Sequence, residues 1–84
     1  MRIEWQNKAR KQLKKLKDRA VIQRILEGID ALESEQPNID LKPLINHEYS
    51  HRLRVGNYRV FLNIDEIIEI AIVEEVKKRD ERTY

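Results

Sequence analysis

The sequence lacks cysteine altogether, which excludes disulfide bonds, thiolate nucleophiles and cysteine-based zinc sites. It contains only two histidines, so we expect no bound metal and no other cofactor. No apolar run approaches the roughly 18 residues that cross a membrane, and the first residues include no apolar stretch of signal-peptide length. These absences predict a cytoplasmic protein without metal or disulfide chemistry.

Glycine and proline are scarce, with two residues of each, and the chain contains no Gly/Ser-rich linker, low-complexity tract or internal repeat. Nothing therefore marks a domain boundary, and we predict a single domain over residues 1–84. A domain of this size buries only roughly 60–65% of the surface that its unfolded chain exposes. Its margin of stability is accordingly small, on the order of 5 kcal/mol.

Charged residues make up 38% of the sequence, and the two signs are unevenly distributed. Residues 1–24 carry nine Lys or Arg and two acidic residues, whereas residues 25–50 carry one Lys and six acidic residues. In residues 51–84, seven basic and seven acidic residues balance. This asymmetry favours oriented binding to a polyanion, although a lysine-rich, solvated helix face would give the same pattern.

Two consecutive segments show the spacing of amphipathic helices. In the first, apolar side chains recur every three or four residues from Trp5 to Leu16, and the lysines lie off this stripe, so the helix presents a basic outer face. In the second, Asp18 is suited to cap the N-terminus. Pro37 discourages helix at the residue before it, which places the end near Glu35. We expect two short antiparallel helices joined by a tight turn.

The remaining segments favour β-structure. Residues 2–5 alternate polar and apolar and predict a short opening strand. Residues 38–50 read as a loop with at most one short extended piece. Residues 52–55 and 58–64 then alternate across a Gly-Asn turn, which predicts a β-hairpin. Residues 67–76 predict a further strand, central in the sheet, with its isoleucines in the core.

The predicted order is therefore β-α-α-β-β-β. Helices and strands are segregated along the chain, so the fold class is α+β. We expect the N-terminal helical hairpin to pack on one face of a small, mainly antiparallel twisted sheet. The other face is then free to carry polar side chains.

Three arginines gather in the predicted hairpin. Arg52 and Arg54 share one strand face because alternate residues point the same way. Arg59 comes near Arg54 if the hairpin register is tight, and like charges placed opposite one another are unfavourable. No acidic residue interrupts the hairpin, so the cluster favours a phosphate ligand, which guanidinium groups bind in a two-pronged, charge-assisted way. Alternatively, Glu69 or Glu74 on the neighbouring strand neutralises an ordinary exposed face.

The C-terminal tail adds Arg79 and Tyr84. If it folds back beside the hairpin, it brings a fourth cation and a phenol to the same patch. A phenol can stack on a base or transfer a proton, although its ordinary pKa near 10 must fall before it acts as a base, a direction favoured by neighbouring arginines. His47 and His51 are further candidates for a proton carrier, although alternation places His51 on the opposite face from Arg52.

The hairpin sequence Arg-Leu-Arg-Val-Gly-Asn-Tyr-Arg-Val at residues 52–60 resembles the RelE/ParE toxin superfamily of bacterial type II toxin–antitoxin systems. The C-terminal half of that family usually reads R-x-R-V-G-(D/N)-Y-R-V, followed by an isoleucine-rich strand and a basic tail that ends in tyrosine. The K-x-L-K-K-L helix at residues 11–16 is also typical of the family. The resemblance covers nearly the whole chain and favours the RelE branch.

The resemblance implies a toxin that cuts mRNA in the ribosomal A site without a metal, while basic residues orient the scissile phosphate for attack by the ribose 2′-hydroxyl. Arg59 and Arg79 then stabilise charge that develops in a phosphorane-like transition state. Tyr84 stacks on a base or moves a proton, and Arg54 completes the predicted catalytic set. We expect contacts to RNA phosphates from Arg52, Lys11, Lys14, Lys15, Lys77 and Lys78.

The sequence departs from the family in two respects. Arg52 and Arg54 replace a pair that is lysine in some members, and arginine does not deprotonate in proteins, so acid–base work shifts to Tyr84, a histidine or the ribosome. Acidic residues 80 and 81 also weaken the positive charge of the tail. Two other interpretations stay open: a ParE-like inhibitor of DNA gyrase that cleaves nothing, and a catalytically inactive toxin fold that only binds its partner.

The resemblance also implies partners. A cognate antitoxin protein is expected, and its acidic residues would neutralise the arginine cluster. The ribosome and mRNA are the other expected partners. No membrane is expected, and DNA would be contacted only indirectly, through the antitoxin.

Overall fold

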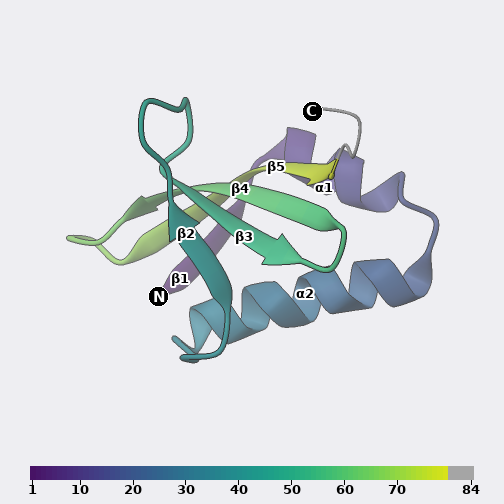
Figure 1. Cartoon of the computed structure of the whole chain (residues 1–84), viewed down its shortest axis with the longest axis horizontal. Coiled ribbons are helices and arrows are strands. Elements are labelled where there is room, and N and C mark those ends of the chain that lie inside the picture. The colour runs from purple at the N-terminus through teal and green to yellow at the C-terminus, as the bar shows by residue number, and fades with distance from the viewer. Residues whose placement is uncertain (80–84) are drawn as a thin grey trace.

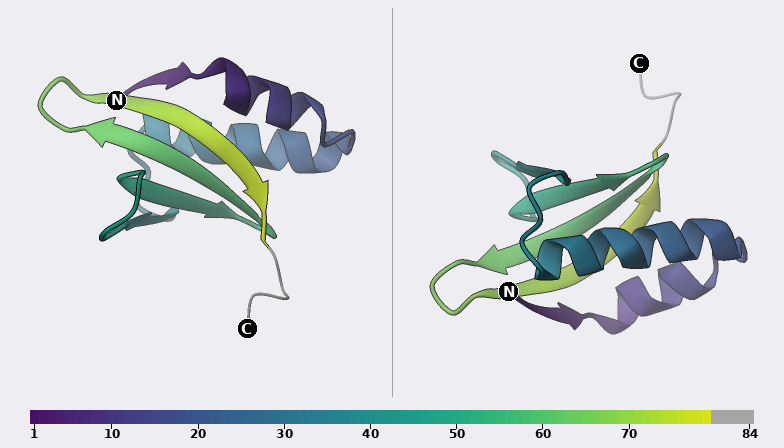
Figure 2. Two further views of the ribbon diagram at one scale, coloured as in Figure 1. Left: turned by 90° about the horizontal axis from the view of Figure 1, so that it is seen from above. Right: turned by 90° about the horizontal axis from the view of Figure 1, so that it is seen from below.

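The computed structural model describes residues 1–79 as one sheet with two helices on one of its faces (Figures 1 and 2). The strands lie in the order β1-β5-β4-β3-β2. The β1 strand pairs in parallel with β5, and every other pair is antiparallel. This arrangement confirms the predicted α+β class. The elements are β1 (Arg2–Trp5), α1 (Asn7–Lys14), α2 (Arg19–Glu33), β2 (Asp40–Pro43), β3 (His51–Val55), β4 (Tyr58–Asp65) and β5 (Ile70–Lys78).

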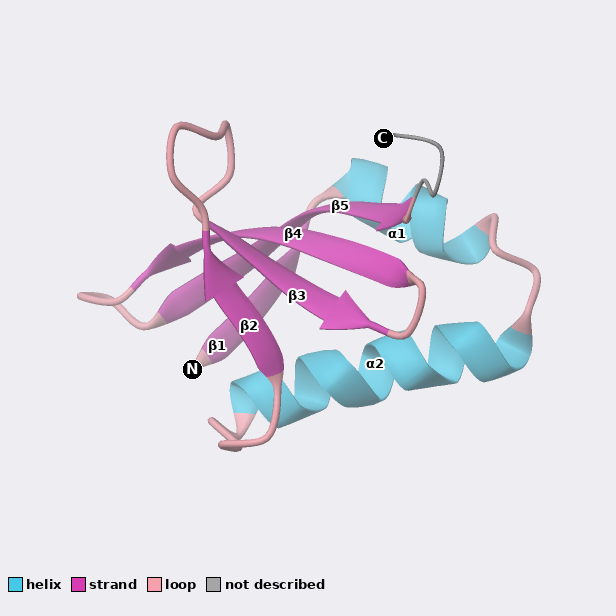
Figure 3. Ribbon diagram, viewed as in Figure 1, coloured by secondary structure: helices cyan, strands magenta, loops and turns pink. Residues whose placement is uncertain are grey.

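The short strand β2 makes the described order one strand longer than the predicted one. It pairs antiparallel with β3 at the edge of the sheet, with Asp40 opposite Arg54 and Pro43 opposite His51. Proline has no backbone N–H to donate, so it is tolerated in an edge strand. The strand β2 corresponds to the one short extended piece that was predicted at most for the loop of residues 38–50. A loop of residues 44–50, hereafter the 44–50 loop, joins it to β3 (Figure 3).

Helix α2 begins where the sequence indicates, whereas α1 begins two residues after the predicted start of its apolar stripe. Asp18 caps α2, because its Oδ1 accepts hydrogen bonds from the backbone N–H groups of Ala20 and Val21 at 3.0 and 3.3 Å. Trp5 closes β1 rather than opening α1, and its partly buried side chain packs against the core. Within residues 1–79, neither helix is long and apolar enough to cross a membrane.

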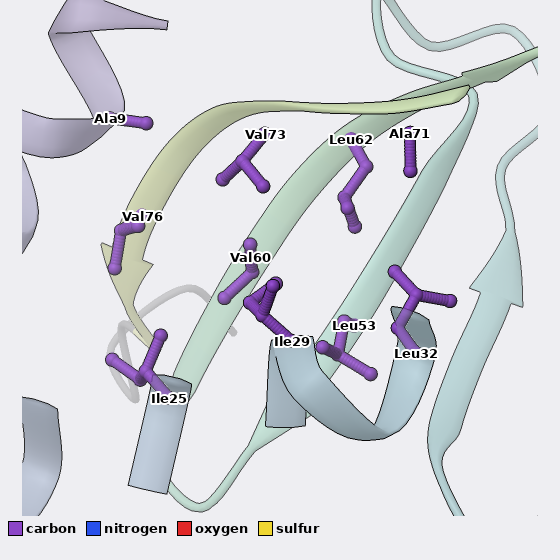
Figure 4. Packing of buried hydrophobic residues seen from close by; sticks show 10 residues of the cluster. All are labelled: Ala9, Ile25, Ile29, Leu32, Leu53, Val60, Leu62, Ala71, Val73 and Val76. Atoms are coloured by element: carbon purple, nitrogen blue, oxygen red, sulfur yellow. The ribbon is translucent and has the colours of Figure 1, made fainter. Parts of the chain in front are cut away.

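The core lies between α2 and the inner face of the sheet (Figure 4). Its largest fully buried side chains come from α2, β3, β4 and β5, so one layer of contacts joins the helix to three strands. Gly28 brings α2 close to the sheet: a Cβ atom at this position would lie 2.9 Å from Cγ2 of Val55. The buried cluster comprises Ala9, Ile25, Ile29, Leu32, Leu53, Val60, Leu62, Ala71, Val73 and Val76.

The prediction for residues 67–76 was wrong at its start. Ile67 and Ile68 lie in the turn before β5 and are 93% and 62% exposed, so they are not core residues. The Oδ1 atom of Asp65 accepts hydrogen bonds from their backbone N–H groups at 3.0 and 3.3 Å. This aspartate-stabilised turn overrides the strand preference of isoleucine, and β5 begins only at Ile70.

Candidate functional site

Arginines from two strands and from the segment after β5 line one groove on the sheet face opposite the helices. Arg54 on β3 pairs with Arg59 on β4, which in turn pairs with Lys77 on β5. The backbone N–H of Arg79 donates to the carbonyl oxygen of Asn57 at 2.6 Å, which fixes the chain just beyond β5. We call this cavity of about 370 Å³ the arginine groove. It is lined by Lys42, Leu44, His47, Arg52, Arg54, Arg59, Phe61 and Arg79.

Strand alternation places these arginines. Leu53 and Val60 are fully buried against the helices, so their neighbours in β3 and β4 project from the other face. Gly56, with φ of 57°, occupies the left-handed conformation that the tight turn requires. The turn sets the register that brings Arg54 opposite Arg59. The predicted convergence of the hairpin arginines is therefore confirmed.

Most of the guanidinium charge in the groove has no partner within residues 1–79. Arg52 is the exception, since its Nη2 lies 3.5 Å from Oδ1 of Asp40. In this part of the chain, no carboxylate oxygen lies within 4.0 Å of Arg54, Arg59 or Arg79. Among residues 1–79, the groove therefore holds three guanidinium groups without a carboxylate partner.

The acidic residues proposed above as alternative partners are engaged or placed elsewhere. The carboxylate of Glu74 accepts a hydrogen bond from Nδ2 of Asn63 at 3.0 Å. Glu69 lies in the turn before β5, at the far end of that strand from the arginines. Neither residue neutralises the groove, so an ordinary charge-balanced sheet face does not describe this surface.

A buried carboxylate, that of Glu75, sits beside the groove and is only 5% exposed. The Tyr49 hydroxyl donates to its Oε2 at 2.8 Å, and Nε2 of Gln12 donates to its Oε1 at 3.4 Å. The Nζ atoms of Lys8 and Lys77 lie 3.3 and 3.6 Å from Oε1. Glu75 thus ties α1, β5 and the 44–50 loop together.

These contacts change the acidity of both partners. Burial alone would raise the pKa of the Glu75 carboxyl, but hydrogen bonds from Tyr49, Lys8 and Gln12 and the charge of Lys77 lower it below its usual value. The hydrogen bond to Glu75, with burial and the negative charge of that carboxylate, raises the pKa of Tyr49 to about 12. Tyr49 is therefore a hydrogen-bond donor at neutral pH and not a base.

Aromatic rings form one wall of the groove. The rings of His47 and Phe61 are stacked, with centroids 5.3 Å apart and planes 10° from parallel. The Tyr49 ring is tilted against both, at 5.8 and 5.6 Å. The backbone N–H of Tyr49 donates to Nδ1 of His47 at 3.1 Å, so the neutral imidazole carries its proton on Nε2. Sequence reasoning missed Phe61, although its position two residues after Arg59 places both on one face.

The predicted phosphate-binding lysines lie outside the lining of the groove. Lys11, Lys14 and Lys15 are exposed on or beside α1, and Lys14 borders a separate cavity between α1 and α2. Lys77 and Lys78 are exposed at the end of β5. By alternation, Lys77 shares the groove face with Arg59, and Lys78 points to the helix side. Of the five predicted lysines, Lys77 is thus the one that β5 places on the groove face, where its Nζ also lies 3.6 Å from Oε1 of Glu75.

The remaining candidates are Tyr84 and the histidines. Tyr84 lies outside the described residues. His51 points away from Arg52, as alternation predicted, and its Nδ1 lies 2.8 Å from Oγ of Ser50. His47 and His51 are four residues apart, but one lies in a loop and the other in a strand. Between residues 1 and 79, no cluster of three or more His, Asp or Glu side chains could hold a metal ion.

Comparison with known proteins places this geometry in a family. The family model for the ParE toxin of type II toxin-antitoxin system, parDE, matches residues 3–81. No curated protein matches the sequence. The structure is similar to the archaeal RelE–RelB complex from Pyrococcus horikoshii OT3, with 26% identity, a TM-score of 0.78, and coverage of 95% of this chain and 96% of that one.

Two further solved structures share the fold. The toxin–antitoxin complex RelBE2 from Mycobacterium tuberculosis is 24% identical, with a TM-score of 0.71 and coverage of 93% of this chain and 96% of that one. A metal-bound toxin from Helicobacter pylori is 17% identical, with a TM-score of 0.75 and coverage of 98% of both chains. At these identities the likeness concerns the fold.

Proposed function

We propose that this chain, which belongs to the ParE toxin family of type II toxin–antitoxin systems within the RelE/ParE superfamily, is a RelE-like toxin that cleaves mRNA on the ribosome. The observation that supports this activity is the arginine groove. Its guanidinium groups from Arg54, Arg59 and Arg79 have no carboxylate within 4.0 Å among residues 1–79. A phosphodiester supplies the negative charge that this groove lacks.

In the proposed reaction, the 2′-hydroxyl oxygen of one nucleotide attacks the adjacent phosphorus. The P–O2′ bond forms and the P–O5′ bond breaks, leaving a 2′,3′-cyclic phosphate and a 5′-hydroxyl. One proton leaves the 2′ oxygen and one reaches the 5′ oxygen, so no metal and no further reactant is required. Arg59 and Arg79 stabilise the negative charge that grows on the non-bridging oxygens. Arg54, which lies opposite Arg59, orients the same phosphate.

No group in the described lining of the groove is suited to accept the 2′ proton as a base, and the Lys42 ammonium is a donor only. Arginine does not deprotonate in proteins. The Nδ1 atom of His47 already accepts a hydrogen bond from Tyr49, whose own phenol has a pKa of about 12. We therefore assign removal of the 2′ proton to Tyr84 or to a group of the ribosome, and the protein's arginines to binding and charge stabilisation.

The test is to incubate the purified protein with translating ribosomes and to map RNA ends by primer extension. We expect cuts within codons that depend on the ribosome, and their loss in Arg59→Ala and in Arg79→Ala. Arg24→Ala is the matched control, since Arg24 is exposed on α2, away from the groove. Circular dichroism of each variant confirms folding. Undiminished cutting by both groove variants would refute the proposal.

The family match itself supports a second candidate, a ParE-like inhibitor of DNA gyrase. This candidate requires no cleavage, so the arginines would serve binding alone. A supercoiling assay with purified gyrase separates the two activities. Inhibition of supercoiling at stoichiometric protein, together with intact mRNA in the ribosome assay, would favour the gyrase candidate over the RelE-like one.

An antitoxin partner is part of the same proposal. The similar structures from Pyrococcus horikoshii and Mycobacterium tuberculosis are toxin–antitoxin complexes. The arginine groove suits acidic antitoxin side chains, which would occupy the phosphate positions and block the substrate. Co-expression with the cognate antitoxin should therefore abolish RNA binding by the groove.

A further inference from the structure

His47 stands at the edge of the arginine groove with an exposed side chain, stacked by one ring face on Phe61. We propose that this imidazole is the platform for one nucleobase of a single-stranded RNA whose phosphate lies on the neighbouring arginines. The proposal deepens the function proposed above and rests on it. It assigns His47 to substrate binding rather than to proton transfer.

The ring geometry suits a third ring in the stack. Phe61 is only 8% exposed and forms the inner layer, whereas His47 is exposed and forms the outer one. Their planes lie 10° from parallel, so a flat base can continue the same direction of stacking. Such stacking tolerates any base because every base has a π-face. The site therefore predicts affinity for a base without strong selection of its identity.

The platform is held in place before any ligand arrives. The Nδ1 atom of His47 accepts the backbone N–H of Tyr49 at 3.1 Å, which orients the imidazole. Tyr49 is in turn anchored through its hydroxyl to the buried carboxylate of Glu75 at 2.8 Å. A prearranged ring loses little conformational freedom on binding. Glu75 and Tyr49 are thus positioning residues for the 44–50 loop.

The stacking ring and the arginines belong to one cavity. His47 lines the same cavity of about 370 Å³ as Arg54, Arg59 and Arg79. One nucleotide could therefore stack its base on the imidazole and place its phosphate against the guanidinium groups. The combination of a cationic groove and an aromatic stacking surface is the usual design of single-strand binding sites.

The experiment measures equilibrium binding of a fluorescein-labelled RNA hexamer carrying 2′-O-methyl groups, which prevent attack by the 2′ oxygen. We expect His47→Ala to weaken binding about fivefold to a hundredfold, the range of one base–aromatic stack. His47→Phe should retain binding because it keeps a flat ring. His51→Ala is the matched histidine control, and it should bind as the wild type does.

A second arm compares the wild type with His47→Ala, using hexamers that each carry one abasic position. One abasic position should weaken wild-type binding as much as His47→Ala does, and should cost the His47→Ala variant nothing more. Equal loss in both proteins at every position, or unchanged binding by His47→Ala, would overturn the stacking site. Arginine-dependent binding without any base dependence would also overturn it, leaving the proposed function intact. Hexamer binding that is unaffected by Arg54→Ala and Arg59→Ala would overturn both.

Discussion

The phenol of Tyr49 donates a hydrogen bond of 2.8 Å to the buried carboxylate of Glu75, although the two residues lie 26 positions apart in the chain. This bond joins the 44–50 loop to β5 and completes a set of contacts that begins on α1 with Lys8 and Gln12. The wall of the arginine groove therefore depends on a carboxylate that does not itself line the groove.

Tyr49→Phe should destabilise the protein by about 1–3 kcal/mol, because a buried charged acceptor loses a donor while the ring contacts remain. Urea denaturation followed by circular dichroism measures the change in the free energy of unfolding. Tyr58→Phe is the control, since the Tyr58 hydroxyl makes no hydrogen bond within residues 1–79. Equal effects of the two substitutions would argue against the anchoring role of Tyr49.

Stability should fall in acid through Glu75. Its folded-state pKa is below the ordinary value of 4.5, so the unfolded state binds more protons as the pH drops. The contribution is fully present above about pH 4.5 and is lost as the pH falls through the lowered pKa. Denaturation curves measured from pH 7 to pH 3 should show a smaller loss in Glu75→Gln. Glu66→Gln, an exposed control, should leave the acid dependence unchanged.

Stability should also fall at alkaline pH, through Tyr49, whose pKa is raised by folding rather than lowered. Its pKa rises from 10.0 to about 12 in the folded state, so the stabilising contribution is present below pH 10 and disappears as the pH approaches 12. Ultraviolet titration of tyrosinate absorbance checks this directly. The high-pH transition near 12 should be absent in Tyr49→Phe and present in Tyr58→Phe.

Arg54→Thr should make the protein slightly more stable and a weaker RNA binder. The substitution removes a like-charge pair with Arg59 and introduces a residue that favours strands, which stabilises the sheet by about 0.2–1 kcal/mol. The gain should shrink at high salt, where the charges are screened. In RNA-binding titrations, the slope of log K against log salt should decrease by about 0.7 for each lost phosphate contact. A destabilised variant with unchanged binding would contradict this assignment of Arg54.

Gly28→Ala should destabilise the protein by about 1 kcal/mol, although alanine is the better helix former. A Cβ atom there would meet the stiff side chain of Val55 at 2.9 Å, and overpacking of this kind costs more than the helix propensity returns. In a Val55→Ala background, the same substitution should instead stabilise by up to about 1 kcal/mol. Thermal and urea denaturation of the four proteins complete the cycle.

The part of the groove formed by the β3–β4 hairpin could be predicted from the sequence, because strand alternation and turn type are local. Alternation in β3 and β4, together with the turn at Gly56, determines which face carries Arg54 and Arg59. The anchor at Glu75 could not be predicted in this way, because Gln12 contacts it across 63 positions. The burial of Glu75 depends on how α1 packs against β5, and this packing cannot be inferred from a short stretch of sequence. The prediction that Ile67 lies in a core strand was wrong for another reason. A single carboxylate oxygen of Asp65 stabilises a turn there, although the segment is apolar.

The parallel pairing of β1 with β5 has a consequence for synthesis. Of the described strands, β5 is synthesised last, and it lies between β1 and β4, so it joins the first strand to the rest of the sheet. Until residues 70–78 have left the ribosome, β1 lacks its partner strand in the described sheet, and a chain that ends before Arg79 lacks part of the groove. Synthesis proceeds from the N-terminus and domains fold as units. A nascent chain therefore cannot assemble the complete arginine groove while its C-terminal strand is still inside the ribosome.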